Sequence, residues 1–319
     1  MRVFWFCSKG KRNGRRPPGN EAAGRGRTGA TGGGKTGNRR GKPRKNRLAA
    51  WAFLLAAATV GAQECGERLW PGNIPVGGTP RGYLCLVIDD FGYNGDGTEE
   101  MLALDVPLTA AILPFSAHSA ADAQRVAAAG KEAIIHMPME SLTGKPEWVG
   151  DRGVFVGMSR EEIAARVDEA LEAVPLAVGL NNHMGSAVME DEAALEAVVA
   201  ALADRGLIFV DSRTTPKSRA GDLCRAAGVP LLSRSIFLDS TDDEAVVRRQ
   251  LERAGQMALS TGSALAIGHV GPEGGVITAR AIAALAPRLR EQGVELVTLT
   301  QLADLLENDG RGLSQTGGL

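Results

Sequence analysis

The sequence predicts an α/β fold in which buried parallel strands alternate with helices to form a barrel or near-barrel. Short apolar runs flanked by helical patterns recur from residue 83 onward, and such runs are typical of parallel strands covered on both faces. Seven or eight strand–helix units in about 225 residues favour a barrel over a sandwich. Five runs end on residues that bind metals or move protons, and three of the four histidines lie at such ends. Because loops after the carboxyl ends of parallel strands build the sites of α/β folds, one polar, metal-capable pocket is expected.

The alternation places each element in order along the chain. Strands are expected near residues 83–89, 108–114, 132–137, 177–182, 207–211, 231–238, 264–269 and 294–299. Helices are expected near residues 97–104, 119–129, 160–173, 191–205, 243–260, 277–292 and 300–306. Ser159 and Glu162 match a capping box, whose side chains satisfy the first free amides of a helix. Gly130, Gly206 and Gly293 each follow a helical pattern and suit the left-handed position that ends a helix.

The first 47 residues differ in composition from the rest of the chain. They hold 15 Lys and Arg and one acid, Glu21, whereas residues 48–319 hold 21 basic and 36 acidic residues. The net charges are therefore +14 and −15, which sum to the overall −1. With almost no aliphatic residues between Cys7 and Leu48, the segment cannot bury enough apolar surface to offset chain entropy. We expect residues 1–47 to be disordered.

An apolar stretch at residues 48–62 follows this basic segment and closes on the small residues Val60–Ala62. A basic region, a short apolar run and a small-residue cleavage site are typical of a secretory signal. The stretch is too short for a comfortable transmembrane helix, which needs about 20 residues. We therefore expect a periplasmic or secreted protein that meets the membrane only through this signal segment during export.

The basic segment has a second interpretation, as a nucleic-acid-binding tail. Its Arg- and Gly-rich composition would suit salt-dependent binding. No aromatic residue lies among the charges from Asn13 to Arg47, however, so the segment offers no base-stacking platform. An over-extended signal, from a start codon placed too early, is the simpler interpretation, and we expect no nucleic-acid partner.

The remaining chain is expected to form a linker at residues 63–81, a single domain at 82–307 and a flexible tail at 308–319, because Gly, Pro and polar residues dominate both flanks. Cys65 and Cys224 could pair in an oxidising compartment, although their spacing does not require it. No CxxC motif occurs, which excludes a cysteine zinc site. No Walker motif or GxGxxG dinucleotide-binding loop follows the first strand, and the chain has no GxSxG motif of a serine hydrolase.

Two adjacent acids, Asp89 and Asp90, end the first apolar run. One interpretation is a helix cap, since Asp caps helices well. Glycines at 92, 95 and 97 place a flexible loop before any helix, which favours a site role: a metal ligand beside a general base. Adjacent strand residues point to opposite faces, so both acids can share one pocket only if the backbone turns at the strand end.

Two histidines also lie at strand ends. His136 precedes Pro138, which fixes the backbone, and His183 follows Asn181 and Asn182 in what we interpret as a packed site loop. A strand histidine can equally be a hydrogen-bonded core residue. Together with Asp90, however, the two histidines form a two-histidine, one-carboxylate set of the kind that holds catalytic zinc and leaves a position for water.

Three further residues are candidates around this set. Asp211 ends another strand and could either orient a ligand histidine or cap its own loop. His269 ends the penultimate strand beside glycines and could serve as a general acid. His118 follows the second strand and is a candidate substrate contact.

Five ordered motifs resemble the divergent polysaccharide deacetylase family. They are Val87-Ile-Asp-Asp-Phe-Gly92, His136-Met-Pro-Met-Glu140, Gly179-Leu-Asn-Asn-His-Met-Gly-Ser186, Asp211-Ser212 and Ile267-Gly-His269, within residues 82–307. The resemblance implies a single-domain, distorted (β/α)7-type barrel. It also implies a divalent metal, most simply Zn²⁺, and hydrolysis of acetyl amide or ester bonds on an acetylated glycan.

The same resemblance implies roles for single residues. Asp89 matches the catalytic base and Asp90 the first metal ligand. His136 matches the first histidine of the metal motif, and His269 the general acid of the last motif.

Two positions depart from the family's usual pattern. Glu140 stands where typical deacetylases have a second metal-binding histidine, so His183 must supply the third ligand. The usual arginine of the third motif is missing from residues 180–186, and Arg213 is the nearest substitute. These departures leave open an alternative, a catalytically inactive module that binds glycan or envelope on the same barrel.

Overall fold

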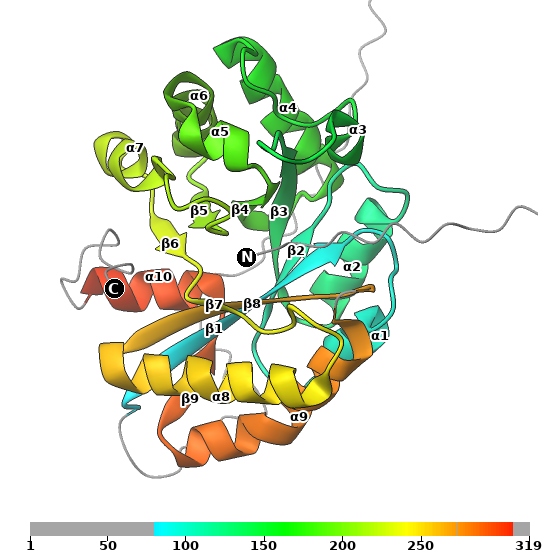
Figure 1. Cartoon of the computed structure of the whole chain (residues 1–319), viewed down its shortest axis with the longest axis vertical. Helices are drawn as coiled ribbons and strands as arrows, with labels where there is room; N and C mark the ends of the chain where they lie inside the picture. The colour runs from blue at the N-terminus through cyan, green and yellow to red at the C-terminus, as the bar shows by residue number, and fades with distance from the viewer. Residues whose placement is uncertain (1–79, 273, 309–319) are drawn as a thin grey trace, which may run out of the picture. The chain divides into compact units, whose positions relative to one another are not determined.

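The sheet is built around β1 (Gly82–Phe91), which pairs with three other strands. The computed structural model describes residues 80–272 and 274–308. Within these residues nine strands form one sheet in the order β6-β5-β4-β3-β2-β1-β8-β7, with β9 also paired to β1 (Figure 1). The other strands are β2 (Thr109–Ile112), β3 (Glu132–Met139), β4 (Ala177–Met184), β5 (Ile208–Asp211), β6 (Leu231–Ser233), β7 (Ile236–Phe237), β8 (Ser263–His269) and β9 (Val294–Val297).

Several sequence-based expectations lie outside the described residues. They concern the basic segment 1–47, the signal segment 48–62, linker residues 63–79 and tail residues 309–319. Cys65 lies there too, so its pairing with Cys224 stays a prediction. Cys224 itself is buried and forms no disulfide with another described residue.

All strand pairs are parallel, and the sheet curls into an incompletely closed barrel. The strand expected at 231–238 is two strands, because β6 pairs with β5 whereas β7 pairs with β8 at the other end of the sheet. Between them, Arg234 N donates to Asp211 O at 3.0 Å and Ser235 N donates to Leu265 O at 2.7 Å. Two residues thus join the sheet's two ends, which confirms the predicted barrel-like α/β fold.

β1 divides one of its edges between two neighbours. Its residues Tyr83–Asp89 pair with β8, whereas Gly82–Cys85 pair with β9 and Val87–Phe91 with β2. Since a strand has only two edges, β9 and β2 must share the one that β8 leaves. The carboxyl-terminal half of β1, which carries both acids, therefore lies between β2 and β8.

Helices cover the outside of the sheet, except α10, which packs against its inner face (Figure 1). Seven lie where the sequence predicts them: α1 (Thr98–Leu102), α2 (Ser119–Ala128), α4 (Arg160–Ala173), α6 (Glu192–Ala203), α8 (Glu244–Thr261), α9 (Gly275–Glu291) and α10 (Leu299–Asn308). Three short helices were not expected, because they have too few turns to show a helical period: α3 (Pro146–Val149), α5 (Ser186–Glu190) and α7 (Ala220–Ala227). In the part of the chain that is described, no helix is long and apolar enough to cross a membrane.

The strands have two apolar faces with different partners. Alternate residues such as Leu84, Leu86 and Ile88 pack in a large cluster with the outer helices. The residues between them, such as Cys85 and Val87, form a second cluster on the inner face, against which α10 packs. This alternation decides which strand-end residues point into the barrel.

The predicted helix boundaries are confirmed. Ser159 Oγ accepts from Glu162 N while Glu162 Oε2 accepts from Ser159 N, which completes the capping box of α4. Gly130, Gly206 and Gly293 have φ of 66°, 64° and 88°, so each adopts the left-handed conformation expected after a helix.

Replacing Ser159 with Ala is expected to lower the free energy of unfolding by about 1 kcal/mol, because the amide of Glu162 loses its acceptor. Urea denaturation measures the loss. Ser159→Asp keeps a capping oxygen and should retain most of the stability. Equal losses in both variants would show that the cap does not stabilise α4.

Candidate metal centre

The backbone turns at the end of β1, as the two adjacent acids require. Asp90 has φ of 69°, in the left-handed region, and the register between β1 and β2 shifts between Ile88 and Phe91. Asp is one of the few non-glycine residues that tolerate this conformation, at a cost of about 1–3 kcal/mol. Asp89 follows Cys85 and Val87 onto the inner face, and the turn allows Asp90 to reach the same pocket.

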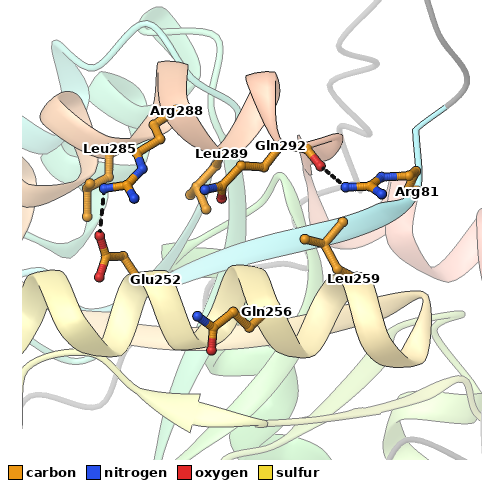
Figure 2. A pocket seen from close by; sticks show the side chains of 8 residues that line it. All are labelled: Arg81, Glu252, Gln256, Leu259, Leu285, Arg288, Leu289 and Gln292. Carbon is orange, nitrogen blue, oxygen red and sulfur yellow. Dashed lines mark hydrogen bonds and ion pairs between the residues drawn. The ribbon is translucent and has the colours of Figure 1, made fainter.

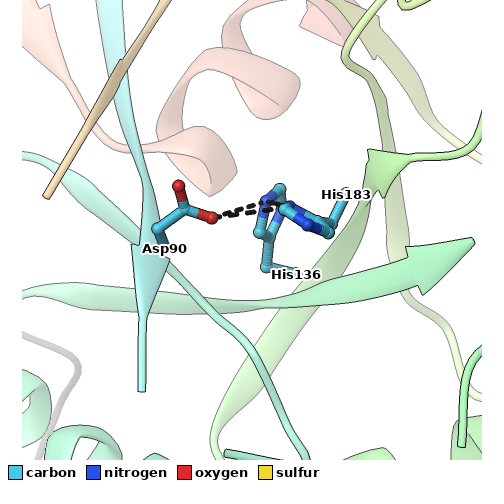
Figure 3. A group of neighbouring side chains, drawn as sticks. All are labelled: Asp90, His136 and His183. Carbon is cyan, nitrogen blue, oxygen red and sulfur yellow. Dashed lines mark hydrogen bonds and ion pairs between the residues drawn. The ribbon is translucent and has the colours of Figure 1, made fainter. Parts of the chain in front are cut away.

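Three side chains from the strands β1, β3 and β4 converge in this pocket (Figure 3). Asp90 Oδ1 lies 3.4 Å from His136 Nε2 and 3.5 Å from His183 Nδ1, and the two nitrogens are 3.0 Å apart. A tetrahedral zinc ion with bonds of about 2.0–2.1 Å separates neighbouring ligand atoms by roughly 3.3–3.4 Å. The spacing of the three atoms therefore matches one face of a zinc coordination tetrahedron.

The polar atoms of this triad also fit a cation. Asp90 Oδ1 is buried and accepts no hydrogen bond. Burial alone would raise the pKa of Asp90, but the neighbouring His136 and His183 hold that pKa well below its usual range. A buried, ionised carboxylate oxygen without a donor is costly unless a positive charge faces it, so the donor set suits a divalent metal.

Asn181 links the triad to the second acid. It is fully buried on β4, opposite His136 in the register of β3 and β4. Its Oδ1 accepts from His136 Nδ1 at 2.7 Å, and its Nδ2 donates to Asp89 Oδ1 at 2.8 Å. Asp89 is 2 % exposed, and burial raises its pKa although the charges of His136 and His269 and the bond from Asn181 oppose the shift.

His269 ends β8 and is held by a carboxylate that sequence reasoning missed. Asp239 Oδ1 accepts from His269 Nδ1 at 2.8 Å, and Asp239 Oδ2 accepts from His269 N and Thr278 Oγ1, each at 2.8 Å. Burial opposes a charge on His269, but Asp239, Asp90 and Asp89 outweigh it and raise the pKa to about 10. The signal was available, since Asp239 ends the apolar run 236–238.

A second missed residue, Arg234, lies at the joint between β6 and β7. Its Nε donates to Ser212 O at 2.7 Å, and its Nη2 donates to Arg213 O at 3.0 Å. The guanidinium carbon is 3.8 Å from the ring centroid of Phe237, whose ring centroid is 5.6 Å from that of His269. A cation, an aromatic ring and an imidazole are therefore stacked beside the pocket.

The two arginines near the pocket differ in exposure. Arg213 is exposed, with φ of 52° and its amide bonded to Asp211 Oδ1 at 2.7 Å. Arg234 is partly buried, and its burial and the charge of Arg213 lower its pKa to about 10 against the opposing carboxylates of Asp211 and Asp89. Of the two arginines, Arg234 is thus the partly buried one, whereas the expected Arg213 is exposed.

Of the two roles predicted for Asp211, capping its own loop and orienting a ligand histidine, the structure shows the first. Its Oδ1 accepts from Arg213 N, and the nitrogen of His136 that it could have oriented bonds to Asn181 instead. The reason is alternation: Val210 belongs to the inner cluster, so Asp211 points to the other face of β5. The prediction that Asp211 orients a ligand histidine is wrong for His136.

The remaining predicted residues lie around the triad rather than in it. Asn182 joins two loops, because its Oδ1 accepts from Ser212 N and its Nδ2 donates to Met184 O. Glu140 Oε2 accepts from Val156 N at 2.8 Å, so this side chain ties down the loop after β3. His118 is exposed at the start of α2.

A cavity of about 320 Å³ lies elsewhere, between α8 and α9 (Figure 2). Arg288 pairs with Glu252 at 3.1 Å on one side, and Arg81 Nη2 donates to Gln292 O at 2.7 Å on another. Its lining includes none of the strand-end residues, so it is separate from the candidate metal centre.

Comparison with known proteins identifies the family. The sequence profile described as "Divergent polysaccharide deacetylase" matches residues 86–303, about two thirds of the chain. The chain belongs to the divergent polysaccharide deacetylase family. The matched region begins within β1 and ends within α10, and it includes Asp90, His136 and His183.

Two curated relatives and one solved structure are similar to the chain. An uncharacterised protein of Haemophilus influenzae is 38% identical over 189 residues, 59% of this chain and 67% of that protein. The uncharacterised protein YibQ of Escherichia coli K12 is 37% identical over 191 residues, which are 60% of this chain and 59% of YibQ. The crystal structure of an uncharacterised Agrobacterium tumefaciens C58 protein has a TM-score of 0.65 at 21% identity and covers 71% of this chain and 90% of that one, which shows a shared fold.

Replacing Asp239 with Asn is expected to lower the pKa of His269 from about 10 toward its usual value. Burial lowers this pKa, and the variant lacks the bonded carboxylate that raises it most. NMR titration of His269 in the metal-free protein measures the shift. Thr278→Val is the matched control, since it removes one donor to Asp239 but keeps the carboxylate, and should change the pKa far less. An unchanged pKa in Asp239→Asn would contradict the pairing.

The same pair predicts a dependence of stability on pH. A pKa raised from 6.5 to about 10 by folding stabilises the native state fully below pH 6.5. That contribution is lost as pH rises toward 10, because the unfolded imidazole has already released its proton. The free energy of unfolding should therefore fall more steeply between pH 6.5 and 10 in the wild type than in Asp239→Asn, as measured by urea denaturation.

Proposed function

We propose that this protein is a metal-dependent hydrolase that removes acetyl groups from a glycan of the cell envelope. The observation that carries the proposal is the convergence of Asp90, His136 and His183 with spacings suited to one metal, beside a buried carboxylate, Asp89, and a charged imidazole, His269. Membership of the divergent polysaccharide deacetylase family supports the reaction class.

The proposed ion is Zn²⁺, because two imidazoles and one carboxylate are a common ligand set of catalytic zinc. Asp90, His136 and His183 would hold it. When bound, such an ion lowers the pKa of water and polarises a carbonyl oxygen. The remaining chemistry falls to the side chains around the triad.

Asp89 is the proposed general base and His269 the proposed general acid. Asp89 would take the proton of the attacking water; its burial, which raises its pKa, favours the protonated carboxyl that results. His269 would give its proton to the leaving amine or alcohol as the bond to the acetyl carbon breaks. The Asp239 carboxylate keeps His269 charged at neutral pH, which is the state that an acid needs.

The substrate and the compartment rest on different observations. Family membership supports an acetylated polysaccharide or oligosaccharide as substrate. The basic segment followed by the apolar residues 48–62 supports export to the periplasm or beyond.

A second candidate function is a module that binds glycan without turning it over. The structure offers one observation in its favour: Glu140, at the place of the usual second metal-binding histidine, ties down a loop instead. Sugar binding that survives Asp89→Asn, with no turnover in either form, would favour this module over an enzyme.

The purified protein is expected to release acetate from acetylated glycans, and a chelator should abolish the release. Asp89→Asn and His269→Ala should each lower kcat by on the order of 100-fold or more, because each removes a proton-transfer group. Acetate release from a panel of acetylated chitin, xylan and peptidoglycan fragments measures it. No acetate from any member of this panel, with metal bound to the wild type, would defeat the proposed activity.

His183→Ala is expected to lose the bound metal, because it removes one of three protein ligands. Metal content by mass spectrometry after purification and dialysis measures the loss. His118→Ala is the control, since this histidine is exposed and lies outside the triad, and it should keep the metal. Equal metal content in His183→Ala and the wild type would place the metal elsewhere.

A further inference from the structure

We propose that Asn181 is a positioning residue that sets two groups of the site at once, the imidazole tautomer of His136 and the orientation of Asp89. Part of the inference, the effect on turnover, rests on the proposed deacetylase function. The effect on His136 rests only on the hydrogen bonds of the described residues.

The position of Asn181 leaves its side chain little freedom. Asn181 has no exposed surface. It pairs with His136 in the register of β3 and β4, so the two side chains lie next to each other on the same face of the sheet. Its Oδ1 lies 2.7 Å from His136 Nδ1, and its Nδ2 lies 2.8 Å from Asp89 Oδ1 and 3.4 Å from Ser212 Oγ. The amide bridges two strands that are not neighbours of each other, β1 and β3.

The side-chain amide of Asn181 has an oxygen that only accepts and a nitrogen that only donates, so each of its contacts has a defined donor and acceptor. The oxygen only accepts, so the proton of a neutral His136 must reside on Nδ1. Nε2 then presents a lone pair toward Asp90 and His183, as a metal ligand requires. The nitrogen end only donates, so it favours the ionised form of Asp89 over the protonated one. The flipped amide would face the Asp89 carboxylate with its oxygen, which repels it.

The choice of an amide follows from its two neighbours. The partner of a metal-binding imidazole is commonly a carboxylate or a backbone carbonyl. A carboxylate at position 181 would satisfy His136 but would face the Asp89 oxygen at close range with a like charge. Asn is the side chain that accepts at one end and donates at the other at this length.

Two substitutions separate the two roles. Asn181→Leu has similar size and loses both hydrogen bonds. Asn181→Asp keeps an acceptor for His136 Nδ1 but loses the donor to Asp89. Asn182→Leu is a stability control, because Asn182 is a neighbouring buried amide that bonds to loop atoms and not to His136 or Asp89.

Nitrogen NMR of the metal-free proteins, at a pH at which His136 is neutral, reports its tautomer directly. The wild type, Asn181→Asp and Asn182→Leu should show His136 protonated at Nδ1, whereas Asn181→Leu should show the Nε2–H form that predominates in free histidine. Chelator competition should show zinc affinity lower by about 10- to 100-fold in Asn181→Leu and within tenfold of the wild type in Asn181→Asp. Turnover should fall in both, with kcat of Asn181→Asp reduced on the order of 100-fold despite its bound metal.

An Asn181→Leu protein that keeps the Nδ1–H tautomer and wild-type zinc affinity would overturn the inference. So would losses of affinity in all three variants that simply follow their melting temperatures, because that pattern describes general destabilisation. If the wild type turns over no glycan, the proposed function fails, but tautomer and zinc affinity still decide the role of Asn181 toward His136.

Discussion

The left-handed turn at Asp90 is the constraint on which the candidate site depends. A regular strand would send Asp89 and Asp90 to opposite faces of the sheet, one into the barrel and one toward the outer helices. With φ of 69°, Asp90 instead reaches His136 and His183 while Asp89 keeps its inward direction. The residues around the turn are paired, because Ile88 and Phe91 pair with β2 and Asp89 pairs with His269 of β8.

Around that turn, buried carboxylates lie close to imidazoles. Three carboxylates, at 89, 90 and 239, lie near three imidazoles: Asp90 Oδ1 is 3.4 Å from His136 Nε2 and 3.5 Å from His183 Nδ1, and Asp239 accepts from His269. Separate partners allow neighbouring groups of the same type to differ, since burial raises the pKa of Asp89 while two histidines lower that of Asp90. This division of labour suits a site that needs both a metal ligand and a proton acceptor within one pair of residues.

Most elements with several repeats of their period could be predicted, whereas three of the four shortest helices could not. The long helices and the buried strands follow their expected ranges, whereas the four residues of α3 and the five of α5 contain too little periodicity to predict. The segment 231–238 was expected to be one strand, although the polar residues Ser233, Arg234 and Ser235 interrupt it where the partner strand changes from β5 to β8. Arg234 lies at that joint and acquires its role from the split.

The sequence by itself determined which residues could serve the site, because chemical type and placement after an apolar run are local properties: Asp90, His136, His183 and His269 needed no contacts to be selected. Only the tertiary structure decided their partners. Asn181 rather than Asp211 supports His136, and Asp239 supports His269, because side-chain alternation and strand order determine which ends meet. Those relations join residues as far apart as 89 and 181, and no local pattern encodes a distance across the sheet.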